Sequence, residues 1–406
     1  MSFKFNVGKM NPIKDQVDDE EKKEDEDTEE DNETPKNSNE LKARLIKLAL
    51  LLGVAIAILL LFIFILSLFN KKTYKYEDIE SIMKNAAVSY FKSYPESLPQ
   101  NEKQTAQISA ATLASAGKMK SLDEYVKKGV SCDGKVEVIK RGNEYIYTPY
   151  LTCGDDYKTQ KLSSLIETSE IVKEGYGLYK INDSYVYRGE LVNNYVLINE
   201  KLWRIVKLDS NENIVLVLDG TFSSQVPWDN RYNDEKKYNA GINVFSASRI
   251  KDTLTSLYND DILDNKETLL DSNIKAHMVN FNLCTGKRTL NDSSHDNSVE
   301  CSSVEKDVKI GLLTVSDYLL ASIDSNCTTT NSRSCQNYNY LNNNTAFWLS
   351  TAKSNTTYQA YLVTTSGIIS DESTSTYANA RAVIHLNSNT LVKSGTGTEK
   401  DPYVIK

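Results

Sequence analysis

The chain has 406 residues, with 55 acidic side chains against 47 basic ones and a formal net charge of −8. This excess of negative charge opposes general attraction to phosphate, so DNA and RNA are not expected as partners. The length predicts more than one domain.

Residues 1–43 form an acidic tail, with acidic runs at 15–21 and 24–31. Almost no aromatic or branched side chains follow Phe5, so the tail buries too little apolar surface to offset its ordering entropy, and we expect disorder. Repulsion between like charges keeps such a tail extended. It serves either as a solvating spacer or as a binding segment for a basic cytosolic partner.

An uncharged apolar run, residues 48–69, follows the tail. Its helix is about 33 Å long at roughly 1.5 Å per residue, enough to cross a bilayer core of roughly 30 Å, and we predict a transmembrane helix over 44–70. The alternative is a cleaved signal peptide. Such peptides have a shorter apolar core near the N-terminus, followed by a small-residue cleavage site, and no such site follows this run. The sequence therefore favours an uncleaved single-pass anchor.

The cysteines indicate the orientation, because basic residues flank the apolar run equally on both sides. All six cysteines follow the run, which favours disulfides formed outside a reducing cytosol. We therefore predict a cytoplasmic N-terminus and C-terminal domains that are extracellular, in a protein of the cell membrane. The alternative is a cytosolic domain with six free thiols. Six cysteines allow about 15 connectivities; pairing nearest neighbours gives Cys132–Cys153, Cys284–Cys301 and Cys327–Cys335.

Residues 75–160 are predicted to form a small helix-plus-hairpin stalk domain. Apolar residues at three- and four-residue intervals predict a helix over 79–91 that ends before Pro95. A second helical stretch is expected over 108–113, and a third over 121–129, where Ser121 and Glu124 form a capping box. Alternating apolar residues predict a β-hairpin over 135–150, which turns at residues 141–143.

The membrane helix, the helix after it and the hairpin closed by Cys132 and Cys153 span residues 45–159. This layout resembles that of bacterial pilin-like proteins. Pilins have a short basic leader that ends in Gly-Phe-Thr-Leu-Ile-Glu-like residues, whereas this chain has a long acidic tail. We therefore expect a fixed stalk rather than a subunit of a fibre.

Residues 175–406 are predicted to form an extracellular α+β domain with antiparallel sheet and long loops, because no βαβ alternation is present. A helix is expected over 248–258, a strand over 310–315 and a short helix capped by Ser316. A polar loop is expected over 284–307. The remaining predicted strands are 176–181, 185–187, 194–198, 202–208, 214–218, 346–350, 358–364 and 380–386.

Three segments carry a second resemblance, over about residues 200–390: 202–206 (Leu-Trp-Arg-Ile-Val), 347–351 (Phe-Trp-Leu-Ser-Thr) and 380–386 (Ala-Arg-Ala-Val-Ile-His-Leu). They resemble an uncharacterised family of bacterial surface domains related to the C-type-lectin and formylglycine-generating-enzyme-like fold. The resemblance implies a C-type-lectin-like domain with a loop-rich ligand face. Phe347, Ser350 and Ala382 depart from the family pattern, and Ser350 argues against a shared ligand role for the arginine that it replaces.

No metal, cofactor or catalytic site is expected. The three histidines, His277, His295 and His385, are far apart and lack zinc-site spacing. Residues 209–213 resemble the start of a calcium-binding EF-hand loop, but the required glycine and glutamate are missing further on. Residues 228–230 echo the Trp-Asn-Asp calcium motif of lectins in a different order. No serine-hydrolase motif is present, and we interpret Cys327 and Cys335 as a structural disulfide rather than a reactive pair.

Binding remains as the predicted function. Trp203 and Trp348 lie between aliphatic residues and are expected in the core. Residues 227–233 have the composition of a loop, and we predict candidate ligand contacts at Trp228, Asp229, Arg231 and Tyr232. The ligand would be a glycan, cell-wall material or a protein. Two alternatives stay open: Trp228 packs onto its own domain, or the protein is a structural or assembly factor that couples a cytosolic partner to an envelope complex.

Overall fold

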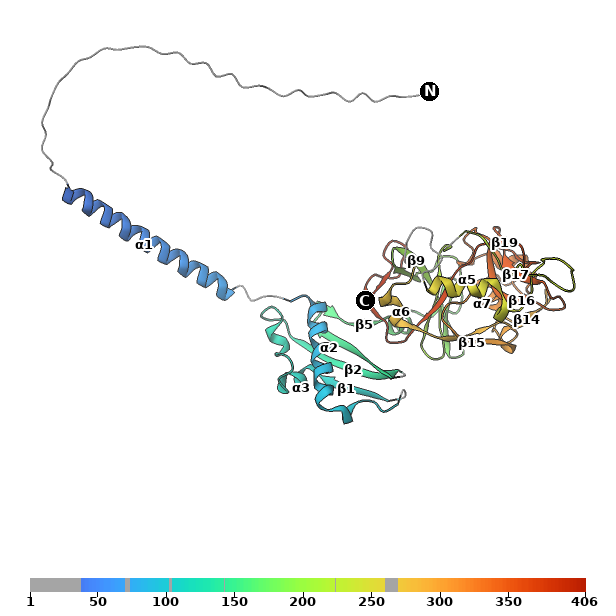
Figure 1. The fold of residues 1–406 in the computed structure, drawn as a ribbon, viewed down its shortest axis with the longest axis horizontal. Coiled ribbons are helices and arrows are strands. Elements are labelled where there is room, and N and C mark those ends of the chain that lie inside the picture. The colour runs from blue at the N-terminus through green and yellow to red at the C-terminus, as the bar shows by residue number, and fades with distance from the viewer. Residues whose placement is uncertain (1–37, 70–73, 102–103, 142, 223, 260–268) are drawn as a thin grey trace, which may run out of the picture. The chain divides into compact units, whose positions relative to one another are not determined.

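The computed structural model describes residues 38–69, 74–101, 104–141, 143–222, 224–259 and 269–406. The chain divides into two compact units, Met1–Lys71 and Lys72–Lys406, and each is considered by itself (Figure 1). Most of the predicted acidic tail, residues 1–37, lies outside the described residues, and so does Gly142 in the predicted hairpin turn.

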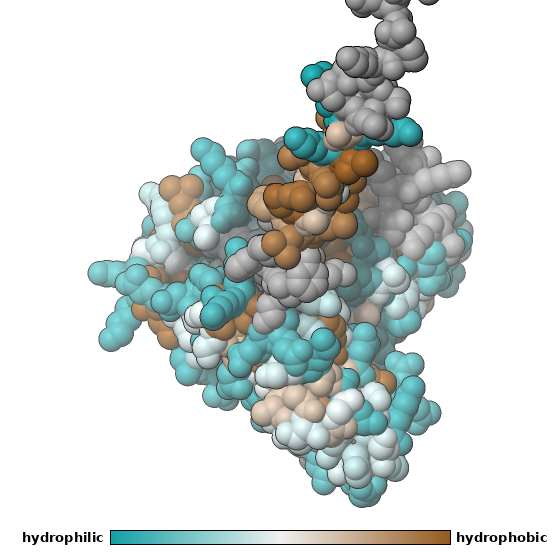
Figure 2. Space-filling view, turned by 90° about the vertical axis from the view of Figure 1, so that its left-hand side faces the viewer, coloured by the Kyte–Doolittle hydropathy of each residue, from teal (hydrophilic) through white to brown (hydrophobic). Residues whose placement is uncertain are grey.

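The first unit contains one helix, α1 (Ser38–Phe69). Within it, Lys42–Ile63 is long and apolar enough to cross a membrane, and none of this segment is buried. Figure 2 shows the described side chains of α1 mostly in brown, the colour of hydrophobic residues. Exposed apolar side chains on all sides of a helix are typical of a helix solvated by lipid rather than by water. The predicted apolar helix is therefore confirmed by its length and composition.

The second unit begins with a stalk region, which we define as residues 74–158. The buried face of α2 packs on a four-stranded antiparallel sheet in the order β1-β2-β3-β4 (Figure 1). The predicted first helix and the hairpin are confirmed. The elements are α2 (Tyr76–Ser93), the 3-10 helix η1 (Pro95–Ser97), β1 (Thr105–Ser109), α3 (Ala110–Ser115), the 3-10 helix η2 (Leu122–Glu124), β2 (Cys132–Arg141), β3 (Glu144–Cys153) and β4 (Tyr157–Lys158).

Two predictions in the stalk region are wrong. The expected helix over 108–113 starts as a strand, because β1 pairs with β2 and places Ile108 opposite Val136 in the sheet. Only residues from Ala110 onwards are helical, in α3. The expected helix over 121–129 is reduced to the three residues of η2, and the Ser121 side chain makes no capping hydrogen bond. Tertiary pairing thus overrides local helix signals.

The distal region, which we define as residues 160–406, is a mixed α+β structure dominated by antiparallel strand pairs. A ten-stranded sheet has the path β12-β20-β10-β9-β8-β22-β21-β5, with β7 joined to β9 and β6 to β7. A smaller sheet has the order β14-β16-β17-β18. The predicted α+β class is confirmed, whereas the C-type-lectin-like fold stays a prediction.

The helices are α4 (Leu162–Glu167), α5 (Arg249–Tyr258), α6 (Ser272–His277), α7 (Val315–Ala321) and the 3-10 helices η3 (Phe245–Ala247), η4 (Glu300–Ser302) and η5 (Arg333–Gln336). The strands are β5 (Gln160–Lys161), β6 (Gly177–Ile181), β7 (Ser184–Arg188), β8 (Tyr195–Ile198), β9 (Lys201–Leu208), β10 (Ile214–Leu218), β11 (Val226–Pro227), β12 (Met278–Val279), β13 (Phe281–Cys284), β14 (Lys287–Arg288), β15 (Val304–Val308), β16 (Phe347–Lys353), β17 (Gln359–Val363), β18 (Ile369–Ser373), β19 (Tyr377–Ala378), β20 (Val383–Leu386), β21 (Leu391–Ser394) and β22 (Tyr403–Ile405).

Buried side chains form two separate hydrophobic clusters, one within residues 79–153 and one within 162–405. All five residues of β10 are buried in the second cluster. Trp203 and Trp348 are fully buried there, which confirms their predicted place in the core. The predicted strand over 310–315 is wrong: only an isolated bridge from Gly311 to Val383 forms there. The helix that follows is capped by Thr314 and Asp317 rather than by Ser316.

The six described cysteines form three disulfides. The predicted nearest-neighbour pairing is confirmed, and no described cysteine is free. The bonds are Cys132–Cys153, Cys284–Cys301 and Cys327–Cys335. Cys132 and Cys153 are directly opposite each other at the ends of β2 and β3, as the hairpin predicted.

Candidate functional site

The predicted contact loop begins at β11, which pairs with β19. Trp228 follows β11 and is fully buried. Its indole nitrogen donates a hydrogen bond to the carbonyl of Leu349 at 3.0 Å, and its ring packs edge-on against Phe245. The prediction that Trp228 contacts a ligand is therefore corrected, because the indole is a satisfied part of the core.

Asp229 is also fully buried and is corrected in the same way. Its carboxylate accepts hydrogen bonds from the backbone nitrogens of Ile242 at 2.7 Å and Arg249 at 3.2 Å. It also accepts one from Nε of Arg231 at 2.8 Å. Because Arg249 is the first residue of α5, the carboxylate satisfies a free N–H at a helix N-terminus. Asp229 therefore joins the start of the loop to Ile242 and to the first residue of α5, so its role is structural rather than ligand-binding.

Two buried asparagines hold the loop against the turn at residues 354–358. The Asn233 amide donates to the Gly241 carbonyl at 2.8 Å and to Thr357 Oγ1 at 3.1 Å. The Asn243 amide donates to the Gln359 carbonyl at 2.8 Å. Gly241 has a φ of 82°, and a Cβ there would collide with the backbone of Asp229. These contacts give the loop one well-defined conformation.

Three tyrosines on this frame face the solvent: Tyr232 is 53% exposed, Tyr238 58% and Tyr377 60%. We call them the tyrosine surface. The backbone nitrogen of Asn233 donates to the carbonyl of Tyr238 at 2.9 Å, which joins the first two tyrosines through one tight turn. Tyr377 lies opposite Pro227 in the β11–β19 pair. Of the four predicted contact residues, Tyr232 is exposed and Arg231 partly exposed, whereas Tyr238 and Tyr377 were missed.

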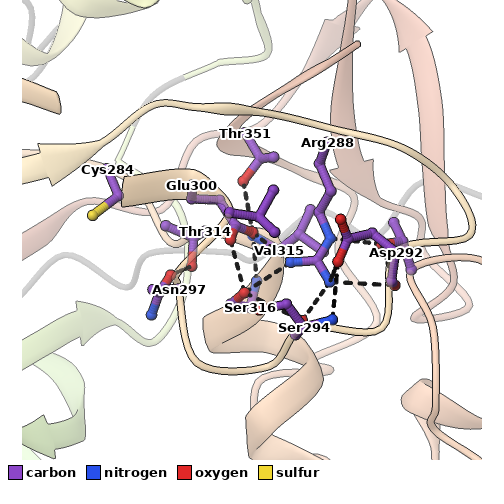
Figure 3. A network of polar contacts seen from close by, with 12 residues as sticks. Cys284, Arg288, Asp292, Ser294, Asn297, Glu300, Thr314, Val315, Ser316 and Thr351 are labelled. Atoms are coloured by element: carbon purple, nitrogen blue, oxygen red, sulfur yellow. Dashed lines mark hydrogen bonds and ion pairs between the residues drawn. The ribbon is translucent and has the colours of Figure 1, made fainter. Parts of the chain in front are cut away.

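A second polar assembly lies in the loop closed by the Cys284–Cys301 disulfide (Figure 3). Arg288 is fully buried and donates hydrogen bonds to Glu300 at 2.9 Å and to Thr330 at 2.7 Å. Ser316 donates to the other oxygen of Glu300 at 2.8 Å. The buried ion pair is therefore surrounded by further hydrogen bonds, the condition under which a buried charge pair is tolerated.

Beside this network lies a surface hollow of about 530 Å³, lined by Ile181, Leu320, residues 292–296 and Ser298. Asp296 accepts hydrogen bonds from Ser294 and Ser298, which hold the pKa of its carboxyl well below the usual range. Burial and the charge of Arg288 lower the pKa of His295, so the imidazole is neutral at pH 7. The sequence indicated a polar loop here, but not the hollow, because the network depends on residues brought together by folding.

Two arginines from the motifs that carried the family resemblance meet at one carboxylate. Arg204 and Arg381 lie 3.9 Å and 3.4 Å from Asp219, and both guanidinium groups are buried. Arg381 also donates to the carbonyls of Leu218 at 2.9 Å and Leu341 at 2.7 Å. These contacts bridge chain segments that are far apart in the sequence, so the arginines stabilise the fold.

Within the described ranges, no group of three or more His, Cys, Asp or Glu side chains could hold a metal ion. His385 stacks on Phe281 with ring centroids 3.8 Å apart, and Ser350 donates to the carbonyl of Cys284 at 3.2 Å. No protein-family model, curated protein or solved structure matches the chain.

Proposed function

We propose that the chain is a membrane-anchored cell-surface protein whose non-catalytic extracellular part binds a glycan, cell-wall material or a protein through the tyrosine surface. The apolar helix α1 and the three disulfides support this location. The observation that carries the proposal is the set of three solvent-facing tyrosines on a frame of buried, hydrogen-bonded polar residues.

Two properties of the tyrosine surface favour ligand binding: the rigid loop beneath it and the large aromatic area that it exposes. Tyrosine offers a large amphipathic contact surface with few rotatable bonds, so little conformational entropy is lost on binding. The loop beneath is held by Asp229, Asn233 and Asn243, and it need not be ordered when a ligand arrives.

The test is binding of the full-length chain, in detergent micelles, to isolated cell-wall material and to a glycan array, with and without calcium. Tyr232→Ala and Tyr238→Ala are each expected to weaken saturable binding at least about tenfold, as truncation of an aromatic hot spot does. Tyr94→Ala is the control, because Tyr94 is 44% exposed in the stalk region. Unchanged binding by both loop variants, or equal loss in the control, would contradict the proposal.

The alternative function, an assembly factor that acts through its acidic tail, predicts a different dependence on the N-terminus. Deleting residues 1–40 should leave ligand binding intact if the extracellular part recognises the ligand by itself. If instead the deletion abolishes association with an envelope complex and the tyrosine variants do not, the assembly role is favoured. Residues 1–37 of the tail lie outside the described residues.

A further inference from the structure

The linker between the stalk and distal regions is very short. β4 belongs to the four-stranded sheet and β5 to the ten-stranded sheet, and Thr159 alone stands between them. The backbone nitrogen of Thr159 donates to the carbonyl of Leu151 at 2.9 Å, and its side chain is buried. We therefore place the hinge between the two regions at Thr159.

One carboxylate fixes this hinge from both sides. Glu80 in α2 is 1% exposed and accepts a hydrogen bond from the Thr159 hydroxyl. Lys406 contacts the other oxygen of Glu80 through Nζ, and it also donates to the Tyr157 hydroxyl at 2.6 Å. The stalk helix, the hinge residue and a lysine from the end of the distal region therefore converge on Glu80.

Lys406 is itself anchored in the distal region. Its backbone nitrogen donates to the carbonyl of Leu391 at 3.0 Å, and Leu391 lies in β21 opposite Lys161 of β5. The ion pair therefore links α2, on the stalk side of the hinge, to Lys406. Lys406 is in turn bonded to β21, which pairs with β5 on the distal side of the hinge. A second ion pair, Lys161–Glu137 at 3.5 Å, also joins the two regions, but both of its side chains are partly exposed. The Glu80 side chain is 2% exposed, so the Glu80–Lys406 contact is the more deeply buried of the two that hinge opening would break.

We propose that the Glu80–Lys406 pair is a lock that holds the stalk and distal regions together as one rigid body. This lock gives the protein a mechanical property in addition to ligand binding. A force applied to the distal region is passed on to the stalk region, because the chain does not bend at Thr159. Removing Lys406 leaves the buried carboxylate of Glu80 without its cation, a strongly unfavourable state that hinge opening relieves by admitting water. Removing Glu80 leaves the partly buried ammonium of Lys406 without its anion, which hinge opening relieves in the same way. Removing both charges does not create this penalty.

Limited trypsin digestion of the full-length chain in detergent micelles tests the lock, because Lys158 is an exposed cleavage site next to the hinge. No disulfide joins the two regions, so a cut after Lys158 separates them on a non-reducing gel. When opening is fast relative to cleavage, the cleavage rate follows the population of the open form. We expect Glu80→Gln and Lys406→Met each to accelerate this cut at least about tenfold, which corresponds to about 1.4 kcal/mol.

The double variant Glu80→Gln/Lys406→Met should be cut more slowly than either single variant, because neither charge is then left alone. A general loss of stability would instead make the double variant the fastest. Glu96→Gln and Lys393→Met remove exposed charges from the two regions and should leave the rate unchanged. Cutting of both single variants at the wild-type rate, or equal acceleration in the controls, would overturn the proposal.

Discussion

Arg288 and Glu300 show how a single buried charge can depend on its partner. Both side chains are fully buried, and Glu300 also accepts a hydrogen bond from Ser316. In Glu300→Gln, Arg288 loses one of its two carboxylate partners and keeps Asp292 at 3.4 Å, and we expect the free energy of unfolding to fall by roughly 1–3 kcal/mol. Urea denaturation of the full-length chain measures this change. The control is Glu124→Gln, whose partner Lys120 is 69% exposed, and it should cost less than about 1 kcal/mol. Equal losses of stability in the two variants would show that the buried pair contributes no more to folding than an exposed pair does.

His385 makes stability depend on pH. Burial, together with the nearby charge of Lys207, lowers the pKa of the imidazole to about 3, whereas an unfolded histidine titrates near about 6.5. As the pH falls below about 6.5, the unfolded chain binds a proton that the native state rejects, so stability present at neutral pH is progressively lost. His385→Phe keeps an aromatic ring against Phe281 and should remove up to about 1.4 kcal/mol per pH unit of this slope. Parallel stability curves for the variant and the wild type between pH 4 and pH 6 would contradict the assignment.

At the scale of elements, the sequence patterns correctly predicted those helices and strands whose formation depends on residues close together in the chain. The apolar spacing over 79–91 corresponds to the buried face of α2, and the alternation over 135–150 corresponds to the β2–β3 hairpin. Ser248 caps α5 by accepting a hydrogen bond from the backbone of Lys251. In each case the residues that set the structure lie within a few positions of one another or in one hairpin.

The failures arose where distant partners decide the outcome. Ile108 has helical neighbours but becomes part of a strand because β2 is available to pair with it. Trp228 stands in a polar segment, yet its indole finds a carbonyl 121 positions away in Leu349. The candidate site was half predictable for the same reason: the loop composition indicated Tyr232, whereas Tyr377 reaches this surface only through the β11–β19 pairing.

At the scale of the whole molecule, α1 predicts how the protein partitions. A helix with the mostly apolar 22-residue span Lys42–Ile63 gains a large free energy from transfer into lipid, because each buried CH₂ contributes about 0.8 kcal/mol. We expect the full-length chain to remain with membranes after alkaline carbonate extraction, and a variant that lacks residues 38–69 to be released. Wild-type protein in the carbonate supernatant would exclude an integral anchor.

The orientation proposed for the chain follows from where disulfides can form. Three disulfides in the Lys72–Lys406 unit require an oxidising compartment, so this unit should lie outside the cell and the acidic tail inside. Protease added to intact cells should then digest the distal region and spare an epitope tag placed before residue 38. Alkylation without a reductant should modify none of the six cysteines, and alkylation after reduction should modify all of them. Six thiols that react without reduction, together with a digested tag, would reverse the orientation and place the tyrosine surface in the cytosol, where a cell-wall ligand could not reach it.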